Sequence, residues 1–219
     1  DTDDFDPRDI ERSPLLRERV QACQAWREKQ SRTGDAWKLR EIPYLMRPNK
    51  SRPLVPYVGI PRVVSADRPF YTVAHLSEKI IAGDQLYTAL DPDGFLFAVI
   101  SSSMFITWQR AIGGHMKSDL RFSNKIVWNT LPLPDASDKQ RAAIIAAGQG
   151  VLDARAEQTG ASLAAMYNPL AMATSLLKAH RVLDRAVDRA FGARKALETN
   201  EQRLAILFKR YQEMTAVES

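Results

Sequence analysis

The segment GFLFAVISSSMFITWQRAIGGHMKSDLRFSNKIVWNTLPLP, residues 94–134, decides how the rest of the chain is arranged. Apolar residues recur at helical spacing in its first half and predict a helix over residues 95–112 with one buried face. Gly113 and Gly114 follow, and residues without a Cβ atom are suited to the left-handed turn that ends many helices. We therefore expect a buried helix that stops at this glycine pair.

A basic loop comes next, because residues 115–125 (HMKSDLRFSNK) combine three Lys or Arg side chains with hydroxyl and amide groups. Residues 126–128 (IVW) predict a short strand, which Pro132 would end. A cationic loop held between a buried helix and a strand can donate hydrogen bonds to phosphates and base edges. The alternative is a solvated surface loop with no ligand.

Charge is distributed unevenly along the 219 residues, whose formal net charge is +5. Residues 38–68 hold seven Lys or Arg against two acidic residues, and residues 110–125 hold four against one. Two basic stretches of this kind favour contact with a nucleic acid more than the mild net charge does. No apolar run approaches the ~18 residues of a membrane-spanning helix, so no membrane contact is expected. Cys23 is the single cysteine, which fits a reducing cytoplasm and a buried structural thiol.

Strands are expected in the middle of the chain and helices at both ends. Residues 8–30 predict a helix with an apolar stripe at Leu16, Val20, Cys23 and Trp26, which should pack on a later segment. The expected strands are residues 57–65, 70–76 and 84–90, set among many prolines that exclude long helices. After residue 135, helices are expected at residues 135–159, 174–191 and from residue 199 onward. Gly148 and Gly150 would mark a close helix crossing.

The central segment resembles the C-terminal half of the MmeI-like DNA methyltransferases. The residues that carry the resemblance are Ile100-Ser101-Ser102, Met104, Trp108, Arg110, Gly113-Gly114, Lys117-Ser118-Asp119, Arg121-Phe122-Ser123-Asn124 and Asn129 to Pro134. A second element, Ile60 to Tyr71, and the helical run from Ala179 to Gly192 also resemble this family. One departure is His115-Met116, where the family more often has Arg-Leu, so one fixed cation is missing.

The resemblance implies a division of labour within a larger enzyme. This chain would be the target-recognition part, which binds double-stranded DNA for an adenine-specific methyltransferase of a restriction-modification or phage-defence system. S-adenosylmethionine would bind the N-terminal methyltransferase domain of the same polypeptide, which is missing from this sequence, and no cofactor is expected in this chain. The expected fold class is α+β. Its parts are an N-terminal helical spacer (1–34), a recognition domain with a small mixed sheet and a packed helix (35–134), and a C-terminal helical domain (135–219).

The sequence offers no active site. Gly148 and Gly150 lie in a predicted helix with no strand before it, unlike a cofactor-binding glycine turn. Asn168-Pro169-Leu170-Ala171 lacks the second proline and the aromatic residue of the loop that holds a flipped adenine. His75, His115 and His180 are scattered and indicate no metal site, and His180 is expected to be a packing or surface residue.

DNA binding is therefore the predicted role, with candidate contacts at Arg62, Ser65, Arg68, Arg110, His115, Lys117, Arg121, Ser123, Asn124 and Lys125. Arg suits guanine and Asn suits adenine, because each can make two hydrogen bonds to one base. We expect the residues after Gly114 to hold mostly phosphates, and the turn at residues 62–68 to reach base edges. Each residue could instead form a surface salt bridge or cap a turn. The rival function is a helical protein-interaction module that assembles a defence complex without touching DNA.

Overall fold

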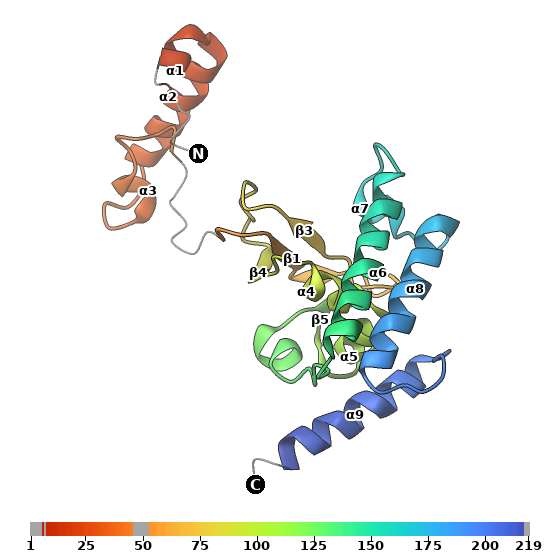
Figure 1. The fold of residues 1–219 in the computed structure, drawn as a ribbon. Coiled ribbons are helices and arrows are strands. Elements are labelled where there is room, and N and C mark those ends of the chain that lie inside the picture. Colours follow the sequence, from red (N-terminus) through yellow and green to blue (C-terminus); the bar gives the residue numbers. More distant parts are fainter. Residues whose placement is uncertain (1–5, 7, 46–52, 217–219) are drawn as a thin grey trace. The chain divides into compact units, whose positions relative to one another are not determined.

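The computed structural model describes residue 6, residues 8–45 and residues 53–216. The chain divides into two compact units, residues 1–52 and residues 53–219 (Figure 1). Every strand in the described part of the chain belongs to the second unit. The α+β fold class predicted from the sequence is confirmed.

The first unit consists of short helices: α1 (Arg8–Arg12), α2 (Pro14–Glu28) and α3 (Asp35–Lys38). The predicted helix over residues 8–30 is interrupted at Ser13, whose side chain accepts a hydrogen bond from Leu16 N at 3.3 Å and caps α2. The predicted buried stripe is wrong within this unit, because Trp26 is 57% exposed and α2 has no buried residue. Cys23 is only partly buried.

The second unit contains two small antiparallel sheets rather than one mixed sheet. In the first, β1 (Tyr57–Pro61) lies between β3 (Ala74–Leu76) and β4 (Leu86–Leu90). In the second, β6 (Asp119–Arg121) lies between β2 (Val63–Val64) and β5 (Gly114–Met116). Pairing over residues 70–76 begins only at Ala74, so the predicted strand there is shorter than expected.

Arg62 is the point at which the chain changes sheets. Its backbone N–H donates to Gln85 O at 3.0 Å beside the first sheet, and its carbonyl accepts from Phe122 N at 2.9 Å beside the second. The predicted single strand over residues 57–65 is therefore split into β1 and β2. The Tyr71 hydroxyl donates to Pro61 O at 2.7 Å and holds the chain at this corner.

The predicted helix over residues 95–112 is also split, into α4 (Phe95–Ile100) and α5 (Ser103–Ile112). Asp91 caps α4, since its carboxylate accepts from Leu96 N at 2.9 Å and Phe97 N at 2.8 Å. Ser102 is extended, and α5 starts anew where Asp184 accepts from both Ser103 N and Ser103 Oγ at 2.7 Å. A carboxylate from a distant helix thus decides where α5 begins.

The strand predicted at residues 126–128 is wrong, because these residues lie in the π-helical turn η1 (Asn124–Trp128). Asn129 N donates to Asn124 O at 3.0 Å, the five-residue spacing that defines this turn. The Trp108 indole donates to Val127 O at 3.2 Å, and Val127 is fully buried. Burial of Val127 against Trp108 outweighs the β-propensity of residues 126–128.

The C-terminal helices α6 (Asp138–Ala156), α8 (Thr174–Ala190) and α9 (Asn200–Ala216) lie close to the predicted ranges. The short helix α7 (Leu163–Met166) was not predicted. Figure 1 shows α6 and α8 side by side against the sheet region. The crossing predicted at Gly148 is confirmed, because a Cβ atom there would lie 2.7 Å from the Cβ of Ala98 in α4. Gly150 meets nothing within 4 Å and marks no crossing. One continuous core therefore joins the helices to the sheets.

Candidate nucleic-acid interface

The ten predicted DNA contacts fall into an exposed group and a partly buried group. The exposed residues are Arg62, His115, Lys117, Arg121, Asn124 and Lys125. The partly buried residues are Ser65, Arg68, Arg110 and Ser123. Three further cations of the basic stretch, Arg47, Lys50 and Arg52, lie outside the residues that the structure describes.

The predicted basic loop after the glycines is a β-hairpin formed by β5 and β6. Its register pairs Gly114 with Arg121 and Met116 with Asp119, which leaves Lys117 at the tip. Lys117 has φ of 57°, the one left-handed conformation at a non-glycine residue among those described. Such a conformation is unfavourable for a residue with a Cβ atom, so the hairpin holds this cation in place at some cost in energy.

The glycine pair does not form the left-handed turn that the sequence suggested. Gly113 is extended, with φ −72° and ψ 156°. It is needed for another reason: a Cβ atom there would lie 1.9 Å from Nε2 of Gln109 and 2.4 Å from its carbonyl oxygen. The absent side chain of Gly113 therefore makes room for Gln109.

Strand pairing directs Arg121 away from the core. Leu120 and Val64 are paired across β6 and β2 and are 2% and 5% exposed, so this face of the sheet packs inward. Arg121 is paired with Val63 on the opposite face, because alternate residues of a strand face opposite sides. The alternation presents the Arg121 guanidinium to solvent.

Arg62 lies beside the hairpin although it is far away in the sequence. Its carbonyl accepts from Phe122 N, one step along the chain from Arg121. Its guanidinium lies over the ring of Tyr87, 4.9 Å from the ring centroid. A cation that rests on an aromatic ring loses little freedom on binding a ligand, because its orientation is already restricted. The fold thus joins two predicted basic segments into one surface.

Two of the predicted arginines point inward. Arg110 Nη2 donates to Ala66 O at 3.1 Å and to Arg68 O at 2.8 Å, and burial lowers the pKa of this guanidinium. Arg68 Nη1 donates to the Thr72 hydroxyl at 2.8 Å. Arg110 is engaged with the protein itself because the turn at residues 65–68 has carbonyl groups that β-pairing does not satisfy, and Arg68 is engaged with a side-chain hydroxyl. Their predicted role as direct DNA contacts stays a prediction.

Ser123 is also engaged locally, since its hydroxyl accepts from Ile126 N at 3.2 Å and caps η1. The same cap leaves Asn124 and Lys125 exposed at the start of the turn. Ser123 therefore helps to orient its neighbours, and its own predicted DNA contact stays a prediction, since the hydroxyl that accepts from Ile126 N still has an O–H to donate.

The exposed cations of this surface are available for a ligand. Within the described residues, no carboxylate forms an ion pair with Arg62, Lys117, Arg121 or Lys125. Surface cations without carboxylate partners attract anions at long range and can hold phosphates on contact. We refer to Arg62, His115, Lys117, Arg121, Asn124 and Lys125 as the hairpin surface.

His180, which was predicted to be a packing or surface residue, is a packing residue of the core. It is fully buried, stacks on Phe70 with ring centroids 3.8 Å apart, and shares a hydrogen bond of 2.7 Å with the Tyr167 hydroxyl. Burial, and to a lesser extent the Arg155 guanidinium, lowers the pKa of His180 to about 3. This imidazole is neutral at physiological pH and packs the helices together.

The other ligands to consider for the part of the chain that the structure describes are metal ions, membranes and cofactors. No group of three or more His, Cys, Asp or Glu side chains there could hold a metal ion. No helix in that part of the chain combines the length and apolar content needed to cross a membrane. Gly148 and Gly150 lie inside α6 and form no cofactor-binding turn.

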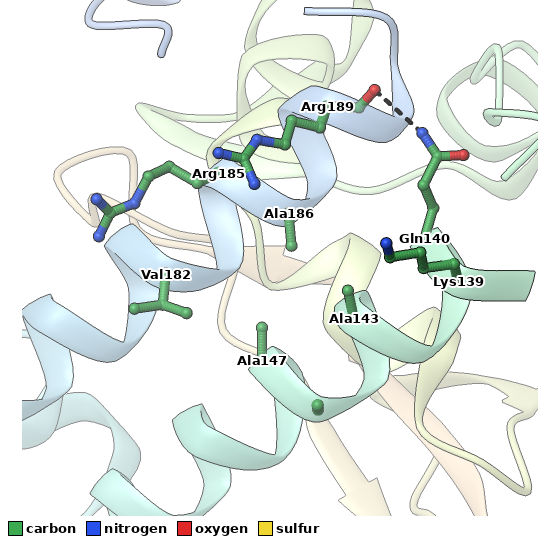
Figure 2. A pocket seen from close by; sticks show the side chains of 9 residues that line it. Lys139, Gln140, Ala143, Ala147, Val182, Arg185, Ala186 and Arg189 are labelled. Atoms are coloured by element: carbon green, nitrogen blue, oxygen red, sulfur yellow. Dashed lines mark hydrogen bonds between the residues drawn. The ribbon is translucent and has the colours of Figure 1, made fainter. Parts of the chain in front are cut away.

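A shallow hollow lies between α6 and α8, on helices that carry none of the predicted contacts. Figure 2 shows alanine methyl groups at its floor, from Ala143, Ala147 and Ala186, with Arg185 and Arg189 along one side. Gln140 reaches across the rim and donates to Arg189 O at 3.5 Å. The alanine side chains of the floor carry no hydrogen-bond donor or acceptor. The hollow could therefore receive an apolar group beside the cations of its rim, but its floor has no reactive side chain.

Sequence reasoning missed Gln109, the residue most closely tied to the hairpin. Its Nε2 donates to Arg121 O at 3.1 Å, and its side chain is fully buried. Helical spacing brings Gln109 close to Gly113, but a polar residue four positions before a glycine is a weak signal, because nothing local shows that its amide reaches Arg121. Only the path of the chain after α5 brings Gln109 and Arg121 together.

Two family models together match almost the whole chain. The model described as the MmeI target recognition domain matches residues 2–135, and that of the MmeI C-terminal domain matches residues 136–217. DNA methyltransferase A of Bacillus subtilis (strain 168) is 34% identical over 206 residues, which are 94% of this chain and 23% of that protein.

A solved structure shows the same similarity. It is the type IIL restriction-modification enzyme MmeI in complex with DNA, with a TM-score of 0.75 and 33% identity. The match covers 98% of this chain and 28% of that one. This chain therefore spans about a quarter of the length of the relatives it matches.

Proposed function

The chain belongs to the MmeI family, as its target-recognition and C-terminal domains, and from this premise we propose that it reads DNA for a methyltransferase. The full polypeptide would be an S-adenosylmethionine-dependent, adenine-specific enzyme of a restriction-modification or phage-defence system that works in the cytoplasm. This part would bind double-stranded DNA and position the target for the catalytic domain of the same polypeptide.

The hairpin surface is the observation that carries the proposal. Its cations come from the β1–β2 corner, the hairpin tip, β6 and η1, and they project from rigid elements. Rigid elements position charges against a duplex at little entropic cost, since few backbone angles change on binding. The similarity to MmeI, which was solved in complex with DNA, supports DNA as the ligand of this surface.

Roles within the surface follow from side-chain chemistry. Lys117, Arg121 and Lys125 would hold phosphates, because their charges are exposed and lack carboxylate partners in the described part of the chain. Arg62 and Asn124 would reach base edges, since a guanidinium and an amide each offer two-point contacts to a base. His115 would add a phosphate contact through a ring N–H, since its side chain is exposed beside the hairpin tip.

Catalysis would take place elsewhere in the polypeptide. S-adenosylmethionine would bind in the catalytic domain and supply its methyl group there. This chain's contribution is binding energy, which holds the duplex in register while the target base is presented.

Reversing two charges tests the proposal. The double variant Lys117→Glu, Arg121→Glu should bind a labelled duplex of random sequence about tenfold or more weakly in fluorescence anisotropy, with a salt dependence reduced by about two phosphate contacts. The matched control is Arg194→Glu, Lys195→Glu, which makes the same change in charge at two exposed residues after α8. In the full-length parent enzyme the first variant should lose methylation while it folds normally.

Two results would contradict DNA binding at this surface. One is unchanged affinity and methylation in the Lys117, Arg121 variant. The other is an equal loss in both double variants, which would show that net charge alone attracts the duplex.

The hollow between α6 and α8 favours a second candidate function, a protein-interaction module. Its small apolar floor and cationic rim fit a partner with acidic side chains. This candidate would replace DNA recognition if two results came together. The Lys117→Glu, Arg121→Glu variant would keep full methylation, and substitution of Arg185 and Arg189 by Glu would abolish binding of the parent enzyme to a protein partner.

A further inference from the structure

We infer that the last turn of α5 is a shared anchor that sets the spacing between two parts of the DNA interface, and that Gln109 and Arg110 are positioning residues. Neighbours in one helix, they hold two segments that are distant in sequence. Gln109 binds the β5–β6 hairpin, and Arg110 binds the turn at residues 65–68. The inference rests on the proposed function and extends it to residues that do not touch DNA.

Gln109 acts on the hairpin through one contact. Its Nε2 donates to Arg121 O at 3.1 Å, next to the guanidinium that would hold a phosphate. The side chain is fully buried and carries no charge, so it cannot reach a duplex or attract one. Any effect of Gln109 on DNA affinity must therefore pass through the hairpin.

The buried amide of Gln109 is poorly explained by stability alone. Its Oε1 has no hydrogen-bond partner among the described residues. A buried acceptor without a partner costs about 1–3 kcal/mol, and an apolar side chain of similar size would avoid that cost. Gly113 adds an entropic cost to folding, because glycine loses more backbone freedom than other residues and only a residue without a Cβ atom fits beside Gln109. The amide thus fits a functional contact better than a packing residue.

Arg110 acts on the other segment. Its Nη2 bridges the carbonyls of Ala66 and Arg68, on either side of Asp67, and so closes the turn. The turn follows β2, which is paired with β6 of the hairpin. Arg110 therefore holds the turn at residues 65–68, which lies on the other side of the surface from which Arg62 and Arg121 project.

α5 is itself held firmly, which an anchor requires. Its Trp108 is 1% exposed and donates to Val127 O in η1 at 3.2 Å, and its first residue is capped by Asp184 of α8. The helix is thus fixed at its start by α8 and near its end by η1. Fixed supports keep binding groups within a few tenths of an ångström of their productive positions.

Two substitutions test the anchor. Gln109→Leu keeps the side-chain volume and removes the donor, and Arg110→Met keeps the aliphatic stem and removes the guanidinium. Each should weaken binding to a labelled random duplex by about three- to tenfold, the effect of losing one ordering hydrogen bond. Hydrogen exchange should quicken at residues 114–121 in the first variant and at residues 65–68 in the second.

Stability separates positioning from a structural role. Gln109→Leu should unfold in urea at a midpoint equal to or above that of the wild type, because the unpaired buried acceptor is gone. A purely structural residue would instead lower the midpoint and leave the affinity of the folded protein unchanged. The matched controls are Gln149→Leu on the exposed face of α6 and Arg185→Met on α8.

The outcomes are distinct. If Gln109→Leu and Arg110→Met fold and bind DNA as the wild type does, while the Lys117, Arg121 variant loses binding, the anchor is wrong and DNA recognition stands. If the Lys117, Arg121 variant binds normally, the proposed function itself is wrong. If Arg185→Met loses as much affinity as Arg110→Met, charge alone explains the result and the anchor is overturned. Should Gln109→Leu fail to fold, Arg110→Met decides in the same way.

Discussion

At Lys117 the backbone conformation favours glycine, but the residue present is a lysine. The hairpin tip places it at φ 57°, where glycine is the favoured residue, yet the position holds an exposed cation. Proteins retain such strained residues where a side chain serves a purpose that glycine cannot. The conflict is consistent with a phosphate contact at the tip.

Replacing Lys117 by Gly should therefore separate stability from binding. The free energy of unfolding should rise by about 1 kcal/mol, since glycine adopts the left-handed region without a Cβ clash. DNA affinity should fall, because the cation is lost. Urea unfolding and anisotropy measure the two effects. Lys125→Gly is the matched control: it removes a cation from η1 and should destabilise the protein, as glycine does within helical turns. Lower stability in Lys117→Gly would contradict the account of strain.

His180 links stability to pH. Burial lowers its pKa to about 3 from an ordinary value near 6.5, so the unfolded chain takes up this proton at a higher pH than the folded protein does. Its contribution to stability is complete above pH 6.5 and declines as the pH falls toward 3. Arg155 and Tyr167, which lie beside it, carry no opposite charge that would retain the proton.

His180→Phe should remove this pH dependence. Phenylalanine can keep the stacking on Phe70, while the hydrogen bond to Tyr167 is lost and stability at pH 7 falls modestly. Between pH 6.5 and pH 5 the wild type should lose about 2 kcal/mol relative to the variant, or ~1.4 kcal/mol per pH unit. Urea unfolding at several pH values measures the difference. Parallel pH profiles for the two proteins would refute the buried neutral imidazole.

Among the elements, the contact between α4 and α6 depends on Gly148. Alanine in its place would bring a Cβ atom to 2.7 Å from Ala98 Cβ, which is closer than van der Waals contact allows. The helices could accept the methyl group only by moving apart. Gly150, two residues later in the same helix, has open space around it.

These two glycines make a matched experiment. Gly148→Ala should destabilise the protein by about 1–3 kcal/mol through overpacking. Gly150→Ala should stabilise it by about 0.5–1 kcal/mol, because alanine is the better helix former. Thermal unfolding of the two variants checks the opposite signs. Adding Ala98→Gly to Gly148→Ala should restore much of the loss, and no recovery would show that the helices do not cross there.

Helices and strands were predicted correctly where the residues that fix their ends are neighbours in the sequence, and less well where those residues are distant. The helices α6 and α8 matched their predicted ranges closely, since the causes are local: α6 begins at the Ser137–Gln140 capping box, and α8 has a strong apolar stripe at helical spacing. The helix over residues 95–112 was predicted as one element because the Asp184 cap comes from another helix. The strand at residues 126–128 was wrong because Trp108 and the core outweigh β-propensity.

At the scale of the whole molecule, the core does not follow the division into family domains. The two family models meet between residues 135 and 136, yet α6 packs on α4 at Gly148 and α8 caps α5 through Asp184. In contrast, the described residues before residue 46 contribute no buried side chain. The functional division at residues 34 and 134 stays a prediction, and the two halves of the second unit share one core.

Truncation tests this shared core. A chain of residues 53–219 should unfold cooperatively in urea at nearly the midpoint of the full chain, because all described buried side chains lie within it. A chain that ends at residue 135 should not, because Phe97 and Trp108 would lose the helices that cover them. Circular dichroism and tryptophan fluorescence can follow both chains. Cooperative unfolding of residues 53–135 alone would contradict a single core.

By itself the sequence determined the α+β class, most helix ranges, the absence of a recognisable catalytic motif, and the basic segments around Arg62 and Arg121. These depend on periodicity, caps and charge, which act over a few residues. Only the tertiary structure decided that the Arg62 carbonyl accepts a hydrogen bond from Phe122 N and that Gln109 supports the hairpin. It also decided that Arg68 and Arg110 form hydrogen bonds within the protein. Arg68 donates to the side-chain hydroxyl of Thr72. The contacts of Arg62, Arg110 and Gln109 are instead hydrogen bonds that involve backbone groups of distant segments, whose positions follow from packing and are encoded by no local pattern.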